Sequence, residues 1–62
     1  MTTYDCRKKT TEKVIDEIKA LNLDNNTEIN IIYFNGNTKV QTIEKILQDL
    51  KWLLDDERYM PF

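Results

Sequence analysis

Apolar residues recur at steps of three and four along residues 10–22, with charged residues between them. The apolar positions are Val14, Ile15, Ile18 and Leu21. A helix of 3.6 residues per turn places all of them on one side, so the spacing predicts an amphipathic helix. Thr10 or Thr11 can accept hydrogen bonds from the first turn, and Asn22 can adopt the left-handed conformation that ends a helix.

A β-hairpin is indicated further along the chain. Residues 28–34 are a strand-length run of β-branched and aromatic side chains, and residues 38–41 suit a returning strand. Asn35 and Gly36 stand between the two runs. This pair is the strongest short signal for a two-residue turn, in which both central residues have positive φ.

A two-residue turn fixes which side chains share a face of the hairpin. It places Ile31 opposite Val40 and Ile32 opposite Lys39. The side chains expected on the core face are Ile29, Ile31, Tyr33 and Val40. Ile32 and Phe34 are then expected on the outer face, where they form an apolar patch that a partner can cover.

The clearest periodic segment is residues 42–57, which predicts a second amphipathic helix. Its apolar positions are Ile43, Ile46, Leu47, Leu50 and Leu54, with Leu53 at the margin. Thr42 suits the cap, and Pro61 prevents continuation.

The expected fold is therefore α+β, in the order helix, β-hairpin, helix. We expect both amphipathic helices to pack on one face of a two-stranded antiparallel hairpin. Tyr4 and Cys6 alternate around Asp5, which allows a short extra strand at the N-terminus. All 62 residues are expected to form a single small domain.

So short a chain has little interior, and small domains usually need a disulfide, a metal or a partner subunit. The chain has one cysteine and no histidine, so it cannot close an internal disulfide or assemble a zinc site. Association with another subunit is the remaining way to stabilise the fold, and we expect a homodimer. Pairing of strand edges between subunits would also protect the open edges of a hairpin.

The overall composition favours a protein that remains in the cytoplasm and does not enter membranes. No apolar run is long enough to cross a bilayer, and residues 1–5 lack the apolar core of a signal peptide. The net charge of −2 does not favour a general nucleic-acid binder, because such proteins neutralise phosphates with basic residues.

Catalytic chemistry is not indicated. The chain has no serine and no histidine, and its single glycine belongs to the expected turn, which leaves no phosphate-binding loop. Cys6 precedes three basic residues that could lower its thiol pKa, but an ordinary semi-exposed thiol is the favoured interpretation. We therefore expect no enzyme activity, no cofactor and no metal site.

Two charged clusters are expected to meet at one end of the domain. In an antiparallel succession of elements, the start of the first helix lies beside the end of the second. The basic cluster is Arg7, Lys8 and Lys9, and the acidic one is Asp55, Asp56 and Glu57. Mutual salt bridges are the favoured interpretation, and an anion-binding site formed by the basic residues is the alternative.

Trp52 is the most unusual position in the chain. On a helical wheel it lies opposite the apolar stripe of residues 42–57, among polar side chains. Such an exposed indole needs a cover, either from a partner or from the apolar tail of the same chain. Tyr59 and Phe62 are the aromatic members of that tail, and we expect them to take part in the contact.

These features favour a small non-enzymatic interaction protein that occludes or bridges a protein partner. Trp52, Phe34, Ile32, Tyr59 and Phe62 are the expected contact residues. The short acidic chain, rich in Asn, Ile and Lys, is similar in composition to phage or plasmid inhibitors and adaptors. The alternatives are a nucleic-acid-binding regulator and a binder or sponge for small anions with a pocket between subunits.

Overall fold

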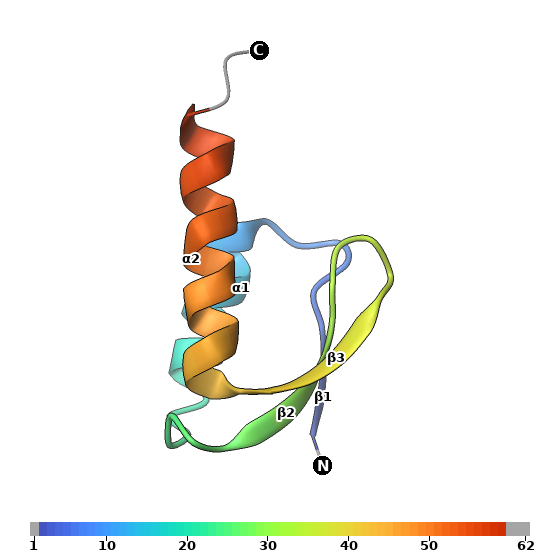
Figure 1. The fold of residues 1–62 in the computed structure, drawn as a ribbon, viewed down its shortest axis with the longest axis vertical. Helices are drawn as coiled ribbons and strands as arrows, with labels where there is room; N and C mark the ends of the chain where they lie inside the picture. Colours follow the sequence, from blue (N-terminus) through green and yellow to red (C-terminus); the bar gives the residue numbers. More distant parts are fainter. Residues whose placement is uncertain (1, 60–62) are drawn as a thin grey trace.

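The computed structural model describes residues 2–59, which form two helices and three strands (Figure 1). The elements in chain order are β1 (Thr3–Asp5), α1 (Thr11–Ala20), β2 (Glu28–Ile32), β3 (Thr38–Thr42) and α2 (Ile43–Tyr59). This confirms the expected α+β class and the short extra strand at the N-terminus.

The sheet is mixed and three-stranded, with the order β1-β2-β3. β1 pairs in parallel with β2, which places Tyr4 beside Ile31, and β3 pairs antiparallel on the other side of β2. The sheet is therefore not the expected two-stranded antiparallel one, because the short N-terminal strand adds a parallel pair to the antiparallel pair of β2 and β3. α1 returns the chain to the start of the sheet, as a parallel pair requires.

Both ends of α1 and the start of α2 lie at the polar residues that the sequence predicts for them. Thr10 caps α1 and accepts a hydrogen bond from Lys13 N–H at 3.2 Å. Asn22, just beyond α1, has a φ of 54°. Thr42 caps α2 in the same way, because its hydroxyl accepts a bond from Lys45 N–H at 3.3 Å.

The hairpin turn contains three residues, Phe34, Asn35 and Gly36, and not the two that were expected. Tyr33 N–H donates to Asn37 O at 2.7 Å, and Gly36 N–H donates to Tyr33 O at 2.9 Å. Gly36 has a φ of 88°, whereas Asn35 is not in the left-handed region. A type I turn followed by a left-handed glycine is the usual three-residue solution.

The extra turn residue shifts the register of β3 by one position. Val40 pairs with Asn30 instead of Ile31 and is 48% exposed, so its expected place in the core was wrong. Phe34 was also misplaced, because it packs against the core. Ile32 alternates with buried Ile31 and is half-buried, which agrees with its expected place on the outer face.

One apolar core joins the sheet to the two helices, which lie side by side on the same side of the sheet (Figure 1). Its buried members are Cys6, Val14, Ile18, Ile29, Ile31, Ile43, Ile46 and Leu50. The Cys6 backbone N–H donates to Ile32 O at 3.1 Å, and its thiol donates to the same oxygen at 2.7 Å. Burial raises the pKa of this thiol, so the basic neighbours do not activate it.

α2 is much longer than α1, and its C-terminal part extends past α1 and past the hairpin turn (Figure 1). The N-terminal part of α2 carries the buried residues Ile43, Ile46 and Leu50. Trp52 follows Leu50 by two residues on α2 and is 60% exposed.

Candidate functional site

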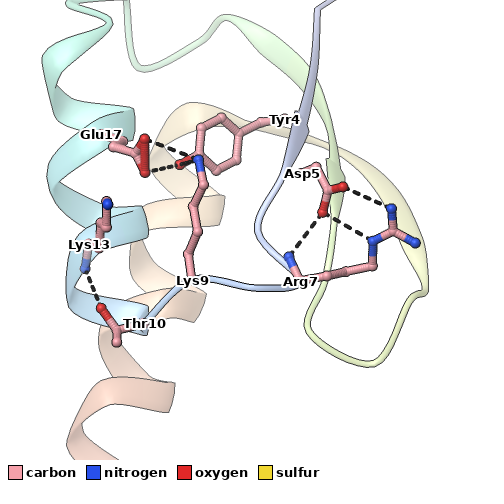
Figure 2. Close-up of polar contacts among 7 residues, drawn as sticks. All are labelled: Tyr4, Asp5, Arg7, Lys9, Thr10, Lys13 and Glu17. Atoms are coloured by element: carbon pink, nitrogen blue, oxygen red, sulfur yellow. Dashed lines mark hydrogen bonds and ion pairs between the residues drawn. The ribbon is translucent and has the colours of Figure 1, made fainter.

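The basic cluster between β1 and α1 is held by local ion pairs (Figure 2). The Arg7 guanidinium donates to both carboxylate oxygens of Asp5, at 3.1 Å from Nε and 2.8 Å from Nη2. The backbone N–H of Arg7 also donates to Asp5 Oδ1 at 3.0 Å. These hydrogen bonds lower the pKa of Asp5 to about 2, because they stabilise its charged form.

Lys9 belongs to a second network on the same loop (Figure 2). Its ammonium donates to Glu17 Oε1 at 3.1 Å and to the Tyr4 hydroxyl at 3.2 Å, while that hydroxyl donates to Glu17 Oε2 at 2.6 Å. Burial and the Glu17 carboxylate raise the pKa of Tyr4, and the hydrogen bonds that Glu17 accepts lower its own pKa. The network ties β1 to α1.

The expected contact between the two charged clusters is only partly present. The start of α1 does lie beside the end of α2, because the Thr11 hydroxyl donates to Glu57 Oε1 at 2.8 Å. The expected salt bridges were wrong, since Arg7 pairs with Asp5 and Lys9 with Glu17. Among the ion pairs of residues 2–59, none includes Lys8.

Trp52 lies on the outside of α2, as the helical wheel predicts, and is 60% exposed. The Lys45 ammonium lies 5.8 Å from the centre of its ring system and 3.5 Å from Asp49 Oδ1. Lys45 therefore covers part of the indole while most of it stays accessible. Tyr59 ends α2, but its side chain, like Phe62, lies outside the described part of the chain, so their expected contact is not described.

A groove of about 820 Å³ separates the hairpin from α2, and we call it the hairpin groove. Its lining residues are Tyr33, Phe34, Asn35, Asn37, Thr38, Lys39, Asp49 and Leu53. The hairpin side comes from the three-residue turn and β3, and the helix side comes from Asp49 and Leu53, which stand one turn apart on α2. The left-handed Gly36 allows the turn that brings Phe34 to this groove.

Tyr33 gives the groove an ordered polar wall. Its hydroxyl donates to Gln41 Oε1, and its ring packs against the core. Burial is the largest cause of the raised pKa of Tyr33, and the nearby Asp49 carboxylate adds to it. Tyr33 therefore stays protonated and neutral in the groove, where it can donate or accept hydrogen bonds.

Of the five expected contact residues, Phe34 lines the hairpin groove. Trp52 is not a lining residue, although it directly precedes Leu53, which lines the helix side of the groove. Ile32 lies away from them on the outer face of the sheet. Leu53 was partly predictable, because its position at the margin of the apolar stripe matches its 36% exposure.

The polar side chains of the groove suit hydrogen bonding and charge recognition. Its lining includes one carboxylate, one ammonium, a phenol, an aliphatic hydroxyl and two carboxamides. Within residues 2–59, no group of three or more His, Cys, Asp or Glu side chains could hold a metal ion. Neither helix of the described chain is long and apolar enough to cross a membrane.

Comparison with protein-family models, with curated proteins and with solved structures finds no match to this chain. Its function is therefore argued from its own residues.

Proposed function

We propose that this chain is a small non-enzymatic interaction module that binds a protein partner through Trp52 and the hairpin groove. The observation that carries the proposal is the 60% exposure of Trp52, which directly precedes the groove residue Leu53 on α2. An indole in this position adds little to the core, whereas tryptophan is strongly enriched among the residues that dominate binding energy. The module acts by occluding or bridging the surface that it covers, as an inhibitor or adaptor of phage or plasmid type would.

The lining of the groove suits a protein surface. Phe34 and Leu53 provide apolar area, and Asn35, Asn37 and Thr38 provide hydrogen-bonding groups around it. An apolar centre with a polar rim is the common arrangement of protein interfaces. The expected occupant is an apolar or aromatic side chain of the partner, flanked by polar groups that pair with the rim.

The two alternatives have weaker support. A nucleic-acid binder or an anion sponge would use Arg7, Lys8 and Lys9, but two of these three cations already pair with carboxylates of the same chain. The net charge of −2 adds no general attraction for phosphates. Both alternatives predict binding that weakens steeply with added salt, which an apolar contact at Trp52 does not.

The test begins with affinity capture from the native host, using the full chain and its Trp52→Ala variant. A captured partner is then purified and titrated by calorimetry. Loss of a binding hot spot should weaken the affinity of Trp52→Ala by about 30-fold or more, and Leu53→Ala should weaken it less. Lys51→Gln is the matched control, because Lys51 is exposed on another side of α2.

Trp52 also reports the contact directly, because it is the only tryptophan of the chain. Its fluorescence emission should shift to shorter wavelength when the partner covers it. Equal dissociation constants for Trp52→Ala and Lys51→Gln, together with an unshifted emission, would show that this surface is not the binding site.

A further inference from the structure

The hydrogen bonds of β2 determine which backbone groups of β3 remain open. Asn30 N–H donates to Thr2 O at 3.0 Å, and Ile32 O accepts from Cys6 N–H at 3.1 Å. These two residues of β2 therefore bond toward β1. Successive residues of a strand direct their backbone groups to opposite sides, so Ile29 and Ile31 bond toward β3.

Val40 stands opposite Asn30, and Thr38 stands opposite Ile32. Their N–H and C=O groups consequently point away from β2, to the outer edge of the sheet. Among the described strands, none pairs with this edge. β3 contains no proline and its register with β2 has no bulge, so of the features that discourage edge pairing it carries one charged side chain, Lys39, in a strand of five residues.

We propose that β3 pairs antiparallel with β3 of a second copy of this chain, about a two-fold axis at Val40. Val40 then faces Val40 of the partner subunit and exchanges two backbone hydrogen bonds with it. Thr38 faces the partner's Thr42, and Lys39 faces the partner's Gln41. All five residues of each strand are paired in this register.

The side chains of β3 select this register over its neighbours. Outward-pointing groups alternate along the strand, so an antiparallel partner can move only in steps of two positions. One such step sets Lys39 against the partner's Lys39 in a close pair, where like charges repel. The opposite step sets Thr38 against the partner's Glu44, which belongs to α2 and not to a strand.

A second copy fits this edge because the sequence of β3 is complementary to itself. Thr pairs with Thr, Val with Val and Lys39 with the partner's Gln41, so no like charges stand directly opposite each other. The resulting sheet has the order β1-β2-β3-β3-β2-β1, with all four helices on one face. The two hairpin grooves then open on the same side of the dimer, and each exposed Val40 gains an apolar neighbour.

Light scattering on the purified full chain tests the dimer. The wild type should have twice the mass of the 7.4 kDa chain. Val40→Pro should give the monomer mass, because proline removes the outward N–H of Val40 while the bonds to β2 remain. Val40→Thr keeps both this N–H and the β-branched shape, and should remain a dimer.

Disulfide cross-linking tests the register without proline. Lys39 and the partner's Gln41 form a close pair with Cα atoms about 4.5 Å apart, within the range of a disulfide. A mixture of Lys39→Cys and Gln41→Cys chains should therefore form a covalent dimer under mild oxidation. Neither variant alone should do so, and neither should the wild type, whose Cys6 is buried.

A wild type that remains monomeric at every concentration would overturn the proposal. So would a dimer that survives Val40→Pro, or cross-linking by Lys39→Cys alone, and a mixed complex with a strand of another protein at this edge would do the same. The dimer is separate from the protein-binding role, because it buries Val40 and leaves Trp52 outside the paired strands. Trp52→Ala should therefore keep the dimer mass whether or not it loses the partner.

Discussion

The two edges of the sheet, which we call the β1 side and the β3 side, differ in how completely their polar groups and apolar surfaces are paired. On the β1 side, Arg7 is paired with Asp5, and Lys9 is paired with Glu17. On the β3 side, the groove beside α2 is open, Trp52 is 60% exposed, and the outer edge of β3 carries no strand among the described residues.

This difference separates residues that hold the fold from residues that remain available for contacts. On the β1 side, the charges of Arg7 and Lys9 are paired inside the chain and have little left to offer a ligand. The β3 side combines exposed apolar area with unpaired backbone groups, and both are favourable only when something covers them. Both proposed contacts therefore lie on the β3 side.

The largest expected effect contrasts two neighbouring positions on α2. Leu50 is 1% exposed in the core, so Leu50→Ala should lower the free energy of unfolding by about 2–5 kcal/mol. Trp52→Ala should change it by no more than about 0.5 kcal/mol, because its side chain lies outside the core. Urea unfolding followed by circular dichroism measures both. A similar loss for the two variants would show that Trp52 stabilises the fold.

Gly36→Ala should have the next largest effect on the free energy of unfolding, through backbone strain in the hairpin turn on the β3 side. The φ of 88° is unfavourable for alanine, and the expected loss is about 1–2 kcal/mol, although a Cβ at this position would meet no atom within 4 Å. Gly36→Asn should cost less, because asparagine tolerates positive φ. The measurement is thermal unfolding, and equal losses for the two variants would argue against backbone strain.

Tyr4→Phe should weaken the β1 side by about 0.5–1.5 kcal/mol, because it removes the hydroxyl that bonds to Glu17 and Lys9. The β3 side should not respond, so the variant should keep the emission wavelength of Trp52. Urea unfolding and fluorescence together check this outcome. A shifted emission would mean that the two sides are coupled.

The smallest effect concerns pH. Pairing with Arg7 lowers the pKa of Asp5 from 3.8 to about 2, so it stabilises the folded state above pH 3.8, and this contribution is lost as the pH falls toward 2. Asp5→Asn should therefore flatten the decline of the melting temperature over this interval. Arg7→Gln should flatten it equally, and a decline that stays as steep in both variants would contradict the assignment.

Local signals in the sequence were sufficient for the helices. The spacing of Val14 and Ile18, the capping hydroxyl of Thr10 and the left-handed Asn22 all act within a few residues, and the structure confirms each of them. The exposure of Trp52 followed from its place on the helical wheel in the same way. These interactions depend little on the rest of the fold.

The errors came from choices that local sequence does not decide. An Asn-Gly pair suits both the two-residue and the three-residue turn, since each requires positive φ at Gly36, and in the longer turn Phe34 packs against the core. The change of one residue reversed the face assigned to Val40. Likewise, nothing near Tyr4 specifies its parallel partner Ile31, which lies beyond a whole helix in the chain.

The position of Cys6 has a consequence for how opening of the molecule can be followed. Its thiol is fully buried and bonded to a carbonyl of β2, so a labelling reagent can react with it only after β1 separates from its neighbour. The rate of labelling therefore measures the frequency of that local unfolding event. The same shielding keeps the sulfur from oxidation for as long as the strand stays in place.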